Sequence, residues 1–354
     1  MNRNIGLDIL RILACFMVVG IHTTPIHINN GQEYNSANLL MQAFYRAGLP
    51  IFFLLSGFFL INKKWNVKSY IYSIIKITIP FIIISLAHYI YLYDISPNVL
   101  LDYIKTITTS ITGVSVHFWF VYVILALYIF SPIITVILSC INEKKSITAL
   151  LITLIIYAFI SNYPALSFAL NTPEYNFKPG PFVWVVYFIF GGLLARCSSM
   201  INIYTPIVVS LVGLIATYKL SSIDFIHFRP YDINVTMLAY SSAILITFLK
   251  LGEKIQSISN NIKNAIISIS DKTYIVYLVH IMVLDAITTN LPEFIEVLSK
   301  SNLYILLTLT CFVFSLVISF LITPIANRIT WLVSHMLNVL PTSKINSQLP
   351  SSMR

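Results

Sequence analysis

Long apolar runs separated by short polar segments dominate the chain. A helix needs about 20 apolar residues to cross the hydrocarbon layer of a bilayer. Ten runs are of usable length, near residues 7–26, 42–61, 70–93, 117–139, 147–163, 181–197, 203–219, 234–250, 273–290 and 302–324. The pattern therefore predicts an all-α polytopic membrane protein of ten transmembrane helices, with no soluble domain between them.

The distribution of basic residues predicts the orientation of these helices. Of the 22 Lys and Arg residues, three lie inside predicted spans: Arg11, Arg46 and Lys76. Five lie on one set of alternate loops: Lys105, Lys178, Lys219, Arg229 and Lys300. The other fourteen lie at the termini and on the opposite loops, and loops rich in Lys and Arg stay in the cytoplasm. We therefore expect a transmembrane domain at 1–330, a short cytoplasmic tail at 331–354, and both termini in the cytoplasm.

Composition narrows the class of protein. Hydrophobic residues make up 57% of the 354 residues and charged residues only 10%, with a mean hydropathy of +0.83. Soluble domains are about one quarter charged, so a soluble enzyme, a disordered chain and a disulfide-rich secreted domain are excluded. The net charge of +9 fits basic cytoplasmic loops better than a nucleic-acid surface. The expected partner is the lipid bilayer, with no nucleic acid.

The first predicted span carries three ionisable residues. Such residues cost free energy inside a bilayer, so they are expected either to serve the function or to pair with one another. Asp8 and Arg11 are three positions apart and can pair on one helix face. Arg11 and His22 are eleven positions apart, which returns within about 20° of the same direction and separates them by roughly 16 Å along the axis. Both therefore lie on one stripe, with Arg11 toward the cytoplasmic side and His22 toward the outer side.

The residues on this stripe suggest a group-transfer reaction. A cation near the cytoplasmic mouth would hold an anionic or polar donor, and an imidazole nearer the outer face would take a proton from a hydroxyl acceptor. The competing interpretation is a snorkelling Arg11 with an interfacial His22. The functional interpretation requires both side chains to reach one shared pocket, which we expect between the first, second, third and ninth spans.

Five segments resemble acyltransferase family 3, the multi-span O-acyltransferases that modify bacterial surface glycans. The first is the Asp-x-x-Arg-x(10)-His pattern that begins at Asp8. The others are YRAGLPIFFLLSGFFL at 45–60, HFWFVYVILALYIFSPII at 117–134, YFIFGGLLAR at 187–196 and SISDKTYIVYLVH at 268–280. Together they cover about residues 5–325. With no esterase domain after the last span, the chain is similar to the stand-alone subgroup represented by the enterobacterial common antigen O-acetyltransferases.

The resemblance implies an O-acyltransferase in the bacterial cytoplasmic (inner) membrane. Such an enzyme moves an acyl group, usually acetyl, from cytoplasmic acyl-CoA to a hydroxyl of a cell-surface glycan or lipid-linked oligosaccharide. It implies no permanently bound cofactor, since acetyl-CoA is the donor substrate. Either direct transfer or a covalent acyl-enzyme is compatible with it. A glycan exporter or other multi-span transporter is the alternative from another class, although the chain shows no clear internal repeat.

The resemblance implies that Arg11 and His22 are the two essential catalytic residues and that Asp8 is the acid beside them. Arg46 precedes the Gly-x-Pro stretch of the second span. The family often has Arg before the third span, where this chain has Lys68 and Lys76. An ammonium group attracts a phosphate as a single charge, whereas a guanidinium binds it through two parallel hydrogen bonds.

Further side chains are candidates for substrate binding. Tyr277 and His280 can line the same cavity, although a helix-packing hydrogen bond explains His280 equally well. Trp119 begins the fourth span beside His117, where anchoring at the membrane interface is the simpler explanation for both. His88 is also expected at the interface, and Asp285 needs a partner that the sequence does not identify. No metal or nucleotide motif is present, so no metal site is expected.

Overall fold

The computed structural model describes residues 3–340 apart from 26, 29–32, 35, 64–65, 94–96, 111, 142, 162–182, 224–233 and 301–302. Within these residues, nine helical segments are long and apolar enough to cross a membrane. They are α1 (Ile5–Thr23), α2 with α3 (Ser36–Tyr45 and Gly48–Leu60), α4 (Val67–Leu92), η2 with α6 (Val116–Phe118 and Trp119–Ser139), α9 with η3 (Val183–Cys197 and Ser198–Met200), α10 (Tyr204–Ile223), α11 (Val235–Lys254), α13 (Thr273–Asn290) and α15 (Tyr304–Met336). The all-α, multi-pass membrane architecture is thus confirmed.

Three details differ from the predicted spans. The run at 147–163 is helical, as α7 (Lys144–Ser161), but it is not among the nine. The run at 42–61 is two helices, because α2 ends at Tyr45 and α3 begins at Gly48. The last helix continues through Pro324 to Met336, so the first part of the expected tail at 331–354 is helical. Residues 341–354 of that tail lie outside the described part of the chain.

Short helices occupy stretches between the predicted spans. They are α5 (Val99–Thr109), α12 (Asn260–Ser270) and α14 (Pro292–Lys300), with the single turn η4 (Ile255–Ser257) before α12. Two short antiparallel strands, β1 (His27–Ile28) and β2 (Glu33–Tyr34), follow α1. These elements are too short to span a bilayer, and a search for 20-residue apolar runs therefore misses them.

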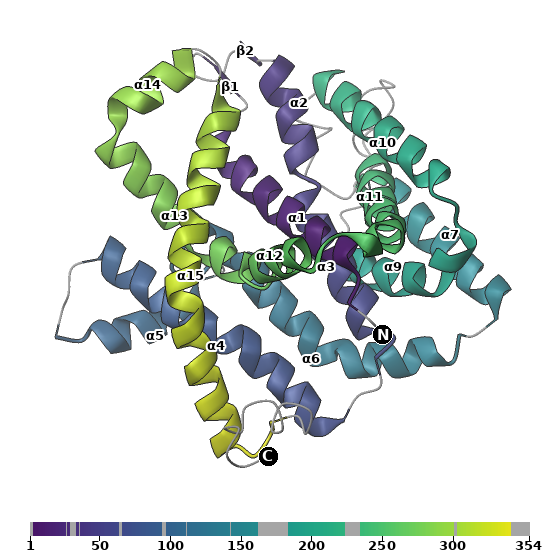
Figure 1. The fold of residues 1–354 in the computed structure, drawn as a ribbon, viewed down its shortest axis with the longest axis horizontal. Helices are drawn as coiled ribbons and strands as arrows, with labels where there is room; N and C mark the ends of the chain where they lie inside the picture. The colour runs from purple at the N-terminus through teal and green to yellow at the C-terminus, as the bar shows by residue number, and fades with distance from the viewer. Residues whose placement is uncertain are drawn as a thin grey trace.

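Helix α1 lies at the centre of the bundle (Figure 1). It packs against α2, α3, α11, α12, α13 and α15. Gly6 and Gly20 give it close neighbours, because a side chain at either position would clash with α11 or with the Tyr45 ring. Since protein surrounds most of this helix, polar residues such as Asp8 and Thr23 are buried against other helices.

The peripheral helices carry the surface that lipid would cover. On α10, Val208, Leu211, Val212 and Ile215 are each more than half exposed. On α15, Leu321 is 71% exposed. A soluble protein rarely exposes so large a contiguous apolar surface, whereas a membrane protein places it against acyl chains. The exposed faces therefore agree with a bundle immersed in a bilayer.

Helices α3 and α9 cross at two glycines. A Cβ at Gly57 would meet the Phe188 carbonyl, and a Cβ at Gly191 would meet the Leu54 carbonyl. Small residues allow membrane helices to approach closely, and van der Waals contact then drives their association. The crossing holds α3, which supplies one wall of the cavity described below, against α9.

We expect Gly191→Leu to separate α3 from α9 and to cost about 3 kcal/mol, because the added side chain has no space to enter. The measurement is the thermal midpoint and the monodisperse fraction of detergent-purified protein. Ser139→Leu adds the same side chain at an exposed position of α6 and is the matched control. Equal stability of Gly191→Leu and Ser139→Leu would contradict the close crossing.

Candidate active site

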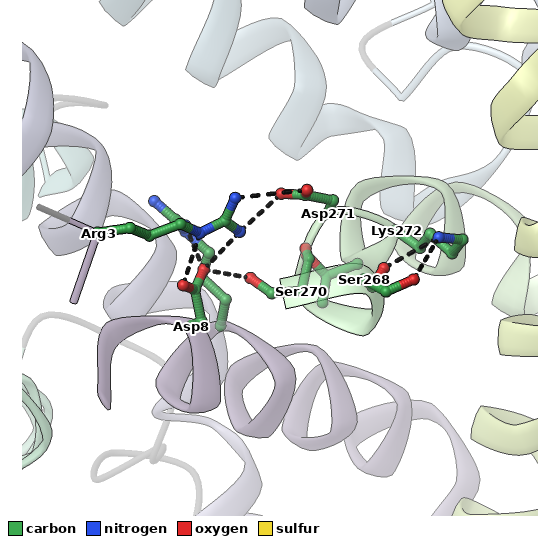
Figure 2. Close-up of polar contacts among 8 residues, drawn as sticks. Arg3, Asp8, Ser268, Ser270, Asp271 and Lys272 are labelled. Carbon is green, nitrogen blue, oxygen red and sulfur yellow. Dashed lines mark hydrogen bonds and ion pairs between the residues drawn. The ribbon is translucent and has the colours of Figure 1, made fainter. Parts of the chain in front are cut away.

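A charged cluster fastens the start of α1 to the turn between α12 and α13 (Figure 2). Asp8, only 1% exposed, accepts hydrogen bonds from Arg3 at 2.7 and 2.8 Å, from Arg11 at 3.0 Å and from the Ser270 hydroxyl at 2.8 Å. Arg3 also donates to Asp271 at 2.7 Å. Hydrogen bonding to Asp8 and Asp271 raises the pKa of the Arg3 guanidinium, despite partial burial. Both carboxylate oxygens of Asp8 therefore accept hydrogen bonds, and one of these bonds fixes the direction of the Arg11 side chain.

Next to this cluster lies a cavity of about 700 Å³. Its walls come from the four predicted spans, seen here as α1, α3, α4 and α13, and also from α6 and α15. On α4 the lining runs from Ser69 to Pro80, eleven positions or about 16 Å of helix. Three cationic side chains line it: Arg11, Lys63 and Lys76. The cavity is thus elongated, and its three cations outnumber the carboxylate in its lining, Asp271, which is paired with Arg3.

Arg11 is held in this cavity from two sides. Its Nη1 donates to Asp8, and its guanidinium carbon lies 4.7 Å from the centre of the Phe59 ring. The side chain retains 31% exposure. A guanidinium with one face on an aromatic ring and one edge on a carboxylate still has donors for a further anion. Arg11 therefore faces the cavity and not the lipid.

The inner end of the cavity is closed by rings. Phe120 and Tyr277 line it, with their ring centres 5.1 Å apart. Behind Tyr277 lie His117 at 5.5 Å and His280 at 5.7 Å between ring centres. His22 follows, 5.2 Å from His280 and 6.5 Å from His117. Two successive sets of rings therefore separate the cavity from His22: Tyr277 comes first, and His117 and His280 follow.

The shared pocket expected for Arg11 and His22 is therefore not seen in this cavity, whose lining includes Arg11 but not His22. The reason is the layer formed by Tyr277, His117 and His280, which the first span does not reveal. The His22 side chain is nevertheless exposed, although imidazole rings flank it. Arg11 and His22 thus lie on one helix stripe but on opposite sides of a ring layer.

Arg46 belongs to the His22 side of that layer. Its Nε donates to Gln42 Oε1 at 3.1 Å. Gln42 in turn donates to the carbonyls of Ile21, at 3.0 Å, and Thr24. The end of α2 is thus fastened to the end of α1, and Gln42 connects the Arg46 guanidinium to the turn of α1 that carries His22.

The structure corrects the interfacial placement of His88 and His117. They are 1% and 3% exposed, and their ring centres lie 5.6 Å apart in the interior. The Nε2 atoms of both rings donate to the Leu278 carbonyl, at 3.2 and 3.3 Å. His117 Nδ1 accepts from Ser115 at 2.9 Å. Their apolar sequence context suggested anchoring, whereas contacts with a distant helix bury them.

Three other expected residues lie elsewhere. Lys68 is exposed near the start of α4 and does not line the cavity. Trp119 is also outside the lining and packs against the Trp184 ring at 5.3 Å. Asp285 accepts a hydrogen bond from the exposed Tyr91 hydroxyl at 2.7 Å, which supplies the partner that the sequence leaves unnamed. Within the described residues, no group of three or more His, Cys, Asp or Glu side chains is arranged to hold a metal ion.

The fold and this arrangement define a multi-pass membrane protein with an internal cationic cavity that ends beside a buried histidine cluster. A family model described as an acyltransferase domain, acyltransferase family 3, matches residues 4–324. The chain belongs to this membrane acyltransferase family.

Two further comparisons add less. A curated protein of Enterococcus faecalis, named an amino-acid racemase, is 24% identical over 342 residues. That alignment covers 88% of this chain but 45% of the racemase, so the chain spans less than half the length of this relative. No solved structure matches the chain. The name amino-acid racemase describes the longer enterococcal protein.

Proposed function

We propose that this protein is an O-acetyltransferase of the bacterial inner membrane. It transfers the acetyl group of cytoplasmic acetyl-CoA to a hydroxyl of a cell-surface glycan or lipid-linked oligosaccharide. The observation that carries the proposal is the cation-lined cavity, whose inner end is separated from the exposed imidazole of His22 by the Tyr277 ring and the two imidazoles behind it. This arrangement gives each substrate its own approach to one reaction centre.

The donor would enter at the cationic end. Coenzyme A carries phosphates, which bind guanidinium and ammonium groups through charge-assisted hydrogen bonds. Lys63, Lys76 and Arg11 supply these groups along the cavity wall. The thioester arm would extend toward Phe120 and Tyr277. Phe120 and Tyr277 must move aside, and the thioester carbonyl must then pass beside His117 and His280, before it can approach His22.

At the reaction centre, His22 takes the proton of the acceptor hydroxyl as general base. The hydroxyl oxygen forms an ester bond with the thioester carbonyl carbon, and the carbon–sulfur bond breaks. The departing thiolate receives the proton from His22 and leaves as coenzyme A. Arg46, which Gln42 connects to the His22 end of α1, would supply the cation that stabilises the oxyanion formed on the carbonyl oxygen during this exchange.

A direct assay uses the purified protein in lipid nanodiscs with acetyl-CoA labelled in the acetyl group. We expect release of free coenzyme A thiol, and transfer of label to a glycan fraction from cells that lack the protein. A glycan exporter would not consume the thioester. The proposal fails if no thiol is released and if the ester-linked acetyl content of cell glycans is the same with and without the gene.

A further inference from the structure

His280 has one nitrogen that the fold leaves without a partner. The side chain is 0% exposed, and its Nδ1 lies 2.6 Å from the Tyr277 carbonyl. A carbonyl only accepts, so Nδ1 carries the hydrogen and Nε2 is a bare lone pair. Within the part of the chain that the structure describes, no hydrogen-bond donor reaches this buried Nε2. An unsatisfied buried acceptor costs about 1–3 kcal/mol, so its retention needs a reason.

The neighbouring imidazoles identify the missing donor. The hydrogens of His88 and His117 are both committed to the Leu278 carbonyl. The other nitrogen of His117 accepts from Ser115, so neither of its nitrogens is available. His22 is the remaining ring beside His280, at 5.2 Å between centres, and has no hydrogen-bond partner among the described residues. Its N–H is therefore the one uncommitted imidazole donor in this group of four.

We propose that His280 is a positioning residue for His22, which rests on the acyl-transfer function proposed above. When substrates occupy the site, a His22 N–H donates to His280 Nε2. This hydrogen bond fixes the His22 tautomer so that the other ring nitrogen is bare and directed at the acceptor hydroxyl. His280 holds no substrate itself and gains or loses no proton during the reaction.

The surrounding contacts hold the His280 ring in place for this role. Its Nδ1 is anchored on the preceding turn of α13, and the backbone carbonyl of His280 accepts from Cys311 Sγ at 3.4 Å. An orienting group must be more rigid than the base that it orients, because catalytic geometry tolerates little displacement.

The test compares His280→Phe, which keeps a ring but removes the acceptor, with His280→Gln, whose amide oxygen can accept at the same depth. We expect His280→Phe to lower kcat about 100-fold, because general base catalysis is worth roughly 100- to 10,000-fold and depends on orientation. The KM for acetyl-CoA should stay within about threefold, because His280 is outside the cavity lining. His280→Gln should recover most of the lost kcat.

His88→Phe is the matched control, because it removes a buried imidazole of the same group whose hydrogen is committed to Leu278. We expect it to retain kcat within about threefold. An unchanged kcat in His280→Phe, an equal loss in His88→Phe, or no recovery in His280→Gln would each overturn the positioning role. If wild-type protein releases no thiol, the proposed function fails instead, so the two failures are distinguishable.

Discussion

Replacing His22 by alanine is expected to lower acetyl transfer at least about 1,000-fold, because the acceptor hydroxyl loses its general base. Binding of acetyl-CoA should change little, since His22 is outside the lining of the cationic cavity. The fold should also survive, because the His22 side chain is exposed and has no hydrogen-bond partner among the described residues. The measurement is kcat and KM for acetyl-CoA in nanodiscs, with the thermal midpoint recorded on the same samples.

Arg11→Gln is the matched comparison, on the same stripe of α1 but on the cavity side of the ring layer. It should raise the KM for acetyl-CoA more than it lowers kcat, because the lost guanidinium binds the donor before reaction. Wild-type transfer by folded His22→Ala protein would remove His22 from the mechanism. Identical kinetic signatures for the two variants would contradict the separation of donor and acceptor sides.

Asp8→Ala is expected to destabilise the protein by about 1.5–3 kcal/mol, because hydrogen bonds to a buried charged group are lost while Arg3 and Arg11 keep partial exposure. Arg11 loses the carboxylate that directs it, Arg3 loses two hydrogen bonds, and the Ser270 hydroxyl loses its acceptor. The same variant should raise the KM for acetyl-CoA, as Arg11→Gln does, because Arg11 is then free to turn away from the cavity. Denaturation midpoints and thiol release would be measured together.

Asp271→Asn provides the control for this cluster. Asp271 also binds Arg3, but its side chain is 57% exposed, and exposed ion pairs contribute about 0–1 kcal/mol. We therefore expect a loss of stability of at most about 1 kcal/mol. If Asp8→Ala costs no more than Asp271→Asn, Asp8 does not act as the buried hub of the cluster.

Sequence patterns located most of the transmembrane helices because a bilayer imposes a length and a polarity that can be counted. The predicted span 273–290 matches α13, and 70–93 differs from α4 by a few residues. The patterns missed the break between α2 and α3 and the continuation of α15 to Met336. The continuation passes through Pro324, and a proline is tolerated where neighbouring helices restore the lost contacts.

The candidate site was only partly visible in the sequence. Ionisable residues inside an apolar span marked Asp8, Arg11 and His22, because such residues are rare there. Arg3 and Asp271 gave no comparable signal, since charged residues outside a span are ordinary. The two residues are 268 positions apart in the chain, and their pairing depends on how α12 and α13 dock on α1.

The amino-acid sequence by itself determined that the chain spans a membrane as a helical bundle, and that its first span holds a carboxylate, a guanidinium and an imidazole on one stripe. Helical periodicity and the cost of charge in lipid are local properties, so no tertiary information was needed. Only the tertiary structure decided that rings from α6 and α13 separate Arg11 from His22, and that His280 Nε2 lies unpartnered beside His22. Those facts depend on side chains far apart in the chain meeting in one packed interior, which no pattern along a single helix encodes.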